Sequence, residues 1–147
     1  MEITTRMEFD AGHRIPNHQS VCKNLHGHRY AIEGTIKGEI GEQSHEQAFG
    51  RVMDVKDAKK LIKMVIVDEW DHAFIAYEKD LEVISFLNTL VNHKTVILKR
   101  VPTAENMAVT ALELLSSAFK KEFGELIRPT KVRLYETPNN WADALAS

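Results

Sequence analysis

The segment Cys22-Lys23-Asn24-Leu25-His26-Gly27-His28 gathers residue types that bind metals and move protons. If His26-Gly27-His28 begins a β-strand, its two imidazoles point to the same face, because side chains alternate with period 2. Both rings can then reach one cation such as Zn²⁺. Two imidazoles leave such a site incomplete, and a catalytic site also keeps a position open for water or substrate. The alternative interpretation is a pair of polar residues flanking a turn glycine.

A third ligand is available at the end of another predicted strand. Apolar and polar residues alternate over residues 3–11, which predicts a strand with one buried face. His13 comes two residues after Ala11, so its side chain is expected on the same face as the apolar residues of this strand. If residues 3–13 and 28–38 pair as an antiparallel ribbon, His13 can join His26 and His28 around the metal. The alternative is a strand-end histidine that its neighbours partly cover.

Three other groups of polar residues have a functional and a structural interpretation. Asp71 beside His72 can bias the protonation of the imidazole, although many histidines simply end helices. Glu136, at a strand end, is either a surface acid or a carboxylate that pairs with two N–H donors of a flat heterocycle. Thr103 and Glu105 are explained by capping of the helix that follows them.

These residues must be positioned by a small α+β fold of the order β-β-α-(α)-β-α-β. Residues 14–25 form a loop in which His18 is expected to be solvated, and 38–50 form a second loop in which His45 is expected to be exposed. Asp54 is expected to cap a helix that ends near Trp70. The further predicted elements are a short packed helix over 81–92, a strand over 95–99, a long helix from Thr103 to Gly124 and a last strand over 130–136. Four strands with helices on one face leave open sheet edges, which subunit contacts often close.

The composition limits the class of protein. The 147 residues suit a single domain, 1–147, and a net charge of −2 gives no general reason to bind nucleic acid or an anionic membrane. The single cysteine excludes an internal disulfide and fits a reducing compartment. Because neither a signal peptide nor an apolar run of membrane-spanning length is visible, we expect a cytoplasmic protein.

Taken together, these motifs resemble those of the 6-pyruvoyltetrahydropterin synthase and 6-carboxytetrahydropterin synthase family. The resemblance spans nearly the whole chain and occurs in the family's order. The segments that carry it are Phe9-Asp10-Ala11-Gly12-His13-Arg14, Cys22 to His28 with Tyr30, Trp70-Asp71-His72, Pro102-Thr103-Ala104-Glu105-Asn106 and Tyr135-Glu136-Thr137-Pro138-Asn139-Asn140.

The resemblance implies a tunnelling fold (T-fold), a β-β-α-α-β-β subunit with a four-stranded antiparallel sheet. Trimers of such subunits close a β-barrel, two trimers form a homohexamer, and the active sites lie between subunits. It also implies a role for each candidate residue: His13, His26 and His28 as ligands of Zn²⁺, Cys22 as the catalytic thiol, Asp71 and His72 as its relay partners, Glu136 as the anchor of the pterin ring, and Thr103 and Glu105 as pocket residues donated across the interface.

The spacing Cys-x-x-x-His-Gly-His with Leu25 resembles the bacterial carboxy-type enzymes. These zinc-dependent carbon–carbon lyases convert 7,8-dihydroneopterin triphosphate to 6-carboxy-5,6,7,8-tetrahydropterin, releasing acetaldehyde and triphosphate, in the pathway to 7-deazaguanines such as queuosine. The alternatives are a 6-pyruvoyltetrahydropterin synthase, which eliminates triphosphate only, and a non-catalytic zinc-stabilised binding module. Arg14 and Lys23 are the nearby candidates for binding the triphosphate.

Overall fold

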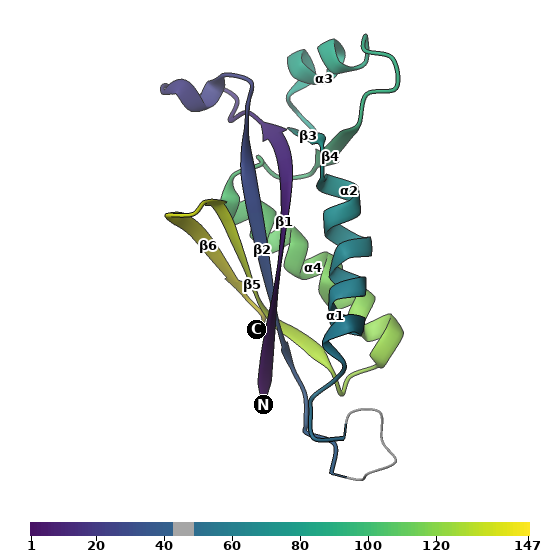
Figure 1. The fold of residues 1–147 in the computed structure, drawn as a ribbon. Helices are drawn as coiled ribbons and strands as arrows, with labels where there is room; N and C mark the ends of the chain where they lie inside the picture. The colour runs from purple at the N-terminus through teal and green to yellow at the C-terminus, as the bar shows by residue number, and fades with distance from the viewer. Residues whose placement is uncertain (43–48) are drawn as a thin grey trace.

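A computed structural model describes residues 1–42 and 49–147 of the chain, so that His45 lies outside the described residues. Two long strands come first, four helices and two short strands follow, and a hairpin ends the chain (Figure 1). The elements are β1 (Glu2–His13), β2 (His26–Lys37), α1 (Val55–Ile62), α2 (Asp68–Trp70), β3 (Ala73–Tyr77), α3 (Leu81–Leu87), β4 (Thr95–Leu98), α4 (Ala104–Phe123), β5 (Arg128–Thr137) and β6 (Asn140–Leu145).

The strands form one six-stranded sheet in the order β4-β3-β1-β2-β5-β6. The predicted antiparallel ribbon is confirmed, because β1 and β2 pair without a break from Glu2 opposite Lys37 to His13 opposite His26. The α+β class is likewise confirmed, but a purely antiparallel sheet of four strands is wrong. Strand β3 pairs in parallel with both β1 and β4, and β6 adds an antiparallel edge to β5.

The two missed strands lack the patterns that identify a strand most clearly. Strand β3, Ala-Phe-Ile-Ala-Tyr, is a continuous apolar run, as buried parallel strands often are, and so shows no alternation. Strand β6, Asn-Trp-Ala-Asp-Ala-Leu, alternates large and small residues rather than apolar and polar ones, and only two residues separate it from the end of β5.

The predicted first helix contains an insertion that moves its buried face. Asp54 caps it as expected, since its carboxylate accepts the N–H of Lys56. Residues 63–67 between α1 and α2 are π-helical, which adds one residue to a turn. The buried stripe therefore passes from Ile62 to Ile66 and on to Trp70, whose ring meets Phe9 of β1 edge-to-face at 6.1 Å. This contact ties the end of α2 to the sheet.

Helix α4 begins and ends as predicted, with the Thr103 hydroxyl accepting the N–H of Asn106 and Gly124 at a φ of 71°. It lies with α1 over one face of the sheet (Figure 1), where their apolar side chains form the main core. Helix α3 is shorter than predicted: it ends at Leu87, and Val91 is 89% exposed. Within the described residues, no helix is both long and apolar enough to cross a membrane.

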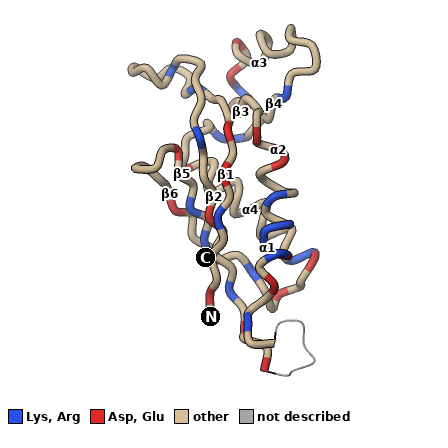
Figure 2. Tube along the Cα trace, in the orientation of Figure 1, with Lys and Arg blue, Asp and Glu red and all other residues tan. Residues whose placement is uncertain are grey.

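Acidic and basic residues are interspersed along the chain (Figure 2). Along β1, β2 and β5, charged residues alternate with buried apolar ones, which places them on the face of the sheet away from the helices. Ion pairs connect neighbouring strands on this face. They join Arg29 to Asp10 at 2.9 Å, Arg6 to Glu33 at 3.3 Å and Arg133 to Asp143 at 2.7 Å. The sheet therefore has one apolar and one polar face.

A more buried ion pair joins the end of β1 to α3. The Arg14 guanidinium donates to both carboxylate oxygens of Asp80, at 2.7 and 2.6 Å, and the Asp80 side chain is only 4% exposed. Asp80 also caps α3 by accepting the N–H of Val83. The hydrogen bonds from Arg14 lower the pKa of the Asp80 carboxyl below its usual value of 3.8.

We expect Asp80→Asn to lower the free energy of unfolding by about 3 kcal/mol, because it leaves a largely buried guanidinium with only the exposed Glu82 carboxylate, at 3.7 Å, as an ionic partner. The stabilising effect of the carboxylate should be complete above about pH 5 and lost as the pH falls through its lowered pKa. Urea titrations between pH 2 and pH 7 measure both effects. The matched control is Glu113→Gln, which breaks the exposed pair with Arg100 and should cost less than about 1 kcal/mol. Equal costs for the two variants would contradict the prediction.

Candidate metal centre and active site

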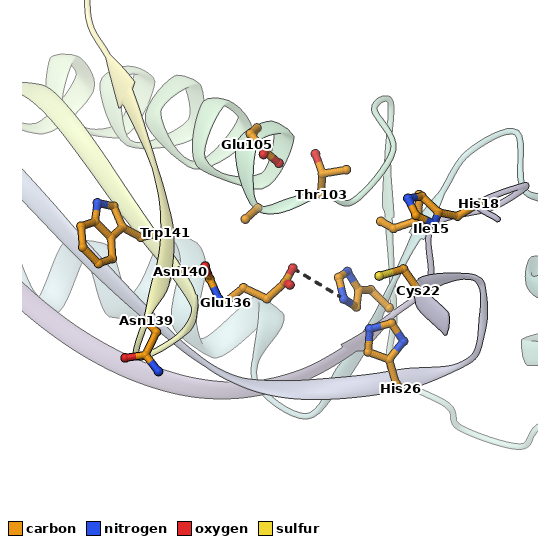
Figure 3. A pocket seen from close by; sticks show the side chains of 12 residues that line it. Ile15, His18, Cys22, His26, Thr103, Glu105, Glu136, Asn139, Asn140 and Trp141 are labelled. Carbon is orange, nitrogen blue, oxygen red and sulfur yellow. Dashed lines mark ion pairs between the residues drawn. The ribbon is translucent and has the colours of Figure 1, made fainter. Parts of the chain in front are cut away.

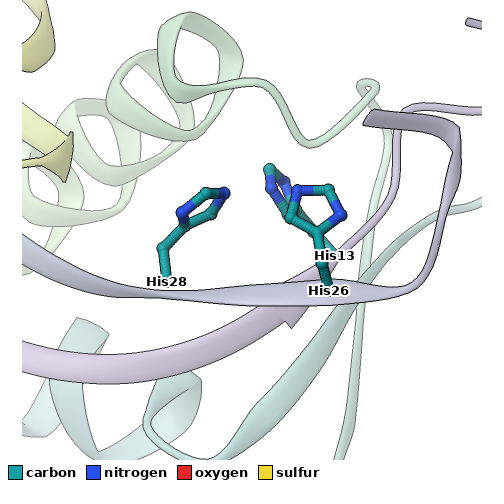
Figure 4. Close-up of side chains that lie close together, drawn as sticks. All are labelled: His13, His26 and His28. Atoms are coloured by element: carbon teal, nitrogen blue, oxygen red, sulfur yellow. The ribbon is translucent and has the colours of Figure 1, made fainter. Parts of the chain in front are cut away.

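The structure brings His13, His26 and His28 together on the helix-covered face of the β1–β2 ribbon (Figure 4). The register sets His26 opposite His13, with His28 opposite Ala11, two residues away along the same face. The ring centroids are 4.7 to 5.1 Å apart, and one nitrogen from each ring lies within 4.8 Å of the other two. This is a group of ligand atoms that one divalent cation can join.

Hydrogen bonds orient two of the three rings. His13 Nδ1 donates to the carbonyl of Pro102 at 2.7 Å, and His26 Nδ1 donates to the carbonyl of Asn24 at 2.6 Å. Because a carbonyl can only accept, each bond assigns the proton to Nδ1 and leaves the lone pair on Nε2. Hydrogen bonds of this kind to the non-ligating nitrogen are typical of histidines that bind metals.

Two buried Nε2 atoms of the three histidines have no hydrogen-bond partner among the described residues. They belong to His13 and His28. Burial is also the main reason why the pKa of each of these two imidazoles lies below 6.5, opposed in part by the nearby charge of Glu136. Neutral imidazole is the form that binds metal. The orphaned atoms, the tautomers of His13 and His26 and the favoured neutral form of His13 and His28 therefore all fit a bound cation.

A pocket of about 600 Å³ opens beside the histidines (Figure 3). Its lining combines predicted site residues with others: His13, His26, Cys22, Thr103, Glu105 and Glu136, together with Ile15, His18, Ala104, Asn139, Asn140 and Trp141. Glu136, near the end of β5, points toward the histidines, with carboxylate oxygens 3.8 Å from His13 Nε2 and 3.6 Å from His28 Nε2.

Cys22 reaches this pocket from the loop between β1 and β2. It lies in a short 3₁₀ turn, Val21–Lys23, which the Ser20 side chain caps. The carbonyl of Cys22 accepts the N–H of Ile15 at 2.8 Å. Among the described residues, the histidine triad is the only group close enough to share a metal, so the thiol lies near the triad without being a fourth ligand. This arrangement leaves Cys22 available for other chemistry.

Thr103 and Glu105 differ from the prediction that they are donated across a subunit interface. They stand at the start of α4 and line the same pocket as the Cys22 of their own chain. Their position follows from that of Pro102, whose carbonyl holds His13. The beginning of α4 therefore forms one wall of the pocket within a single chain.

Asp71 and His72 do not line this pocket. His72 borders a second hollow together with Asp10, Gly12 and Arg29, residues that alternate with the metal-site histidines along β1 and β2. Asp71 Oδ2 lies 3.0 Å from His72 Nδ1, so the two form a carboxylate–imidazole pair. The N–H of Asp10 is the main cause of the lowered pKa of Asp71. The pair is thus formed, but on the other face of the ribbon.

The structure adds to the interpretation of three further residues. His18 is exposed, as predicted, but it also lines the pocket, and its Nδ1 accepts the N–H of Ser20 at 3.0 Å. The signal that could have found it is its place in the same short loop as Cys22. Arg14 is engaged by Asp80, and Lys23 is not among the lining residues, so neither is supported as a triphosphate ligand. Among the described lining residues there is no lysine or arginine.

Comparison with known proteins points to one family. Residues 2–146 match the family model described as 6-pyruvoyl tetrahydropterin synthase. A Rickettsia bellii protein named 6-carboxy-5,6,7,8-tetrahydropterin synthase is 38% identical over 140 residues, covering 95% of this chain and 96% of its own. A Haemophilus influenzae protein of the same name is 31% identical over 145 residues, covering 97% of this chain and 96% of its own.

Solved structures show the same fold. An uncharacterized protein from Wolinella succinogenes superposes with a TM-score of 0.80 at 20% identity, covering 100% of this chain and 98% of its own. The 6-pyruvoyl tetrahydropterin synthase of Caenorhabditis elegans superposes with a TM-score of 0.66 at 25% identity, covering 100% of this chain and 96% of its own. The tunnelling-fold class is therefore confirmed.

We expect the chain to bind one divalent cation, and His28→Ala to weaken that binding by roughly a hundredfold or more, since loss of even an outer-shell partner costs 10–100-fold. Affinity should be steady above pH 6.5 and fall below it, as protons compete for the imidazoles. Titration with Zn²⁺ or Co²⁺ measures both effects. His93→Ala is the control, because His93 is exposed and hydrogen-bonds the Thr95 hydroxyl. Equal affinities for the two variants would contradict this site.

Proposed function

This chain belongs to the 6-pyruvoyl tetrahydropterin synthase family, and we propose that it is a zinc-dependent 6-carboxy-5,6,7,8-tetrahydropterin synthase. In the proposed reaction, the side chain of 7,8-dihydroneopterin triphosphate is cleaved to leave the 6-carboxy product, with release of acetaldehyde and triphosphate. Such an enzyme supplies a precursor of 7-deazaguanines. The product name is that of relatives that match nearly the full length of the chain.

The observation that carries the proposal is the pocket in which Cys22 lies beside three convergent histidines and faces Glu136 (Figure 3). A non-catalytic zinc module would need no ionisable thiol outside its ligand set. It would also need no pocket large enough for a flat heterocycle. The combination instead supports a reaction in which an acid anchors the substrate and a thiol moves a proton.

Glu136 is the proposed anchor of the pterin ring. Its carboxylate can accept two neighbouring N–H groups of the heterocycle in a bidentate pair. Thr103 and Glu105 add a hydroxyl and a second carboxylate at the wall formed by α4, and Trp141 offers an apolar surface at the outer end of the pocket. A ring held in this way directs its 6-side chain toward the histidines.

Cys22 is the proposed proton acceptor at the substrate side chain. As a thiolate it can remove a proton, and a nearby cation would favour the thiolate form. Zinc, held by His13, His26 and His28, would supply Lewis-acid stabilisation of the negative charge that develops on the side-chain oxygens. The remaining proton transfer is assigned to His72, with Asp71 biasing its protonation.

Because Asp71 and His72 lie outside the Cys22 pocket of their own chain, the proposal requires a second copy to bring them there. Strands β4 and β6 are the sheet edges at which copies can join. Three copies joined in this way would close a β-barrel, and two trimers would give the proposed homohexamer, with each active site between subunits.

The function is tested by incubating purified, zinc-loaded protein with 7,8-dihydroneopterin triphosphate. We expect 6-carboxytetrahydropterin and acetaldehyde, identified by mass spectrometry and by a coupled aldehyde assay. Cys22→Ser should keep its zinc and lose roughly a hundredfold or more in kcat, as removal of a general acid or base does. A pterin that retains the side-chain carbons would instead identify a 6-pyruvoyltetrahydropterin synthase. Full turnover by Cys22→Ser would refute the role of the thiol.

Mixing experiments test the shared site. Cys22→Ala chains lack the thiol and His72→Ala chains lack the relay, so each variant alone should be nearly inactive. After dissociation and joint reassembly, some pockets combine an intact Cys22 from one chain with an intact His72 from another. We expect activity to return in those mixed oligomers. If mixing restores nothing although mass spectrometry shows mixed oligomers, the two residues do not act together across chains.

A further inference from the structure

His72 stands in an unusual backbone conformation. Its φ of 59° lies in the left-handed region, which residues with a Cβ adopt rarely and at an energetic cost. The two other described non-glycine residues with positive φ are asparagines, Asn17 and Asn92, a type that tolerates this region. A conformation of this kind persists only where the surrounding structure enforces it. The contacts around His72 therefore show what sets its position.

The first constraint comes from β1. The N–H of His72 donates to the carbonyl of Asp10 at 2.6 Å, and the N–H of Asp10 donates to Asp71 Oδ1 at 2.9 Å. The backbone of Asp10 thus hydrogen-bonds to both members of the Asp71–His72 pair. The parallel pairing of β1 with β3 begins directly afterwards, with Ala11 opposite Ala73.

The second constraint is Lys94. Its Nζ donates to the carbonyl of Asp68 at 2.7 Å and to the carbonyl of Asp71 at 2.6 Å. Carbonyls at the C-terminal end of a helix lack partners within the helix, and a cation there is favoured by the helix dipole. Lys94 is itself held beside this turn, because its own carbonyl accepts the N–H of Phe74 in β3.

The surroundings of Lys94 distinguish it from an ordinary surface lysine. Among the described residues, no carboxylate lies within ion-pair distance of its ammonium group, which is directed instead at two main-chain oxygens. One of these oxygens belongs to Asp71, the residue directly before His72. The ammonium group therefore holds the carbonyl of the Asp71–His72 peptide bond, directly before the residue with the left-handed conformation.

We propose that Lys94 is a positioning residue of the active site: by joining the Asp68 and Asp71 carbonyls it holds the end of α2 so that the Asp71–His72 pair keeps its orientation. The inference rests on the proposed function, in which this pair transfers a proton. Lys94 touches neither substrate nor metal in this scheme. Its effect should therefore fall on turnover rather than on binding.

The test compares Lys94→Met with Lys63→Met. Met keeps much of the apolar stem of lysine and removes the donors. Lys63 is the matched control, because its ammonium also serves this helical segment but binds the exposed Asp68 carboxylate, at 2.5 Å, rather than a carbonyl. We expect Lys94→Met to lower kcat by roughly tenfold or more with KM within about twofold, because small displacements of catalytic groups are costly. Lys63→Met should match the wild type, and Lys94→Arg should recover most of the loss.

Amide hydrogen exchange gives a readout that does not depend on turnover. In Lys94→Met, the His72 and Asp10 amides should exchange about tenfold faster, while the other β1 amides keep their wild-type rates. Unchanged kcat in a folded Lys94→Met protein, or equally faster exchange throughout β1, would overturn the inference. If the wild type does not make 6-carboxytetrahydropterin, the proposed function fails instead, and the exchange pattern alone still decides whether Lys94 holds this turn.

A mixing experiment distinguishes two effects of Lys94→Met: an effect on the Asp71–His72 pair and an effect on the Cys22 pocket of the same chain. Joint reassembly of Lys94→Met chains with Cys22→Ala chains creates pockets with an intact thiol and a relay pair from a chain whose Lys94 is intact. Turnover per intact Cys22 should then rise toward the wild-type value. A failure to rise, in mixtures where Cys22→Ala and His72→Ala do complement one another, would contradict the proposal.

Discussion

The register of one antiparallel strand pair is the constraint on which the site depends. With His26 opposite His13, three imidazoles share a face, and a slip of one residue would turn one strand's histidines to the opposite face. Close approach of the backbones reinforces this register. A Cβ at Gly27 would stand 3.0 Å from the carbonyl oxygen of Ala11, which a strand cannot easily move. The glycine of His-Gly-His therefore serves strand packing as much as ligand placement.

The same arrangement has an energetic cost that a cation would offset. Two imidazole nitrogens are buried without partners, and unsatisfied buried polar groups of this kind cost about 1–3 kcal/mol each. The Asn24 and Pro102 carbonyls fix the His26 and His13 rings in orientations that suit metal ligands, because each accepts the Nδ1 proton and leaves Nε2 free. The region is thus organised for binding rather than for maximal stability in the absence of metal.

Local patterns predicted local structure well and relative placement poorly. Alternation identified β1 and β2, and the caps at Asp54 and Thr103 marked helix starts that the structure confirms. Strand β3 was missed because burial on both faces removes the alternation. The grouping of the histidines followed from side-chain parity. By contrast, the separation of His72 from Cys22 depends on which face of the sheet each reaches, and a linear sequence does not specify that.

The π-helical insertion at residues 63–67 also determines the direction in which the residues after it face. Each residue of a regular helix advances the chain by about 100°, so one residue more or fewer rotates everything beyond it by that amount. Trp70 would then lose its contact with Phe9, and the Asp71–His72 pair that follows it would point in another direction. The length of this segment, more than the identity of its exposed side chains, is therefore what natural variation can least alter.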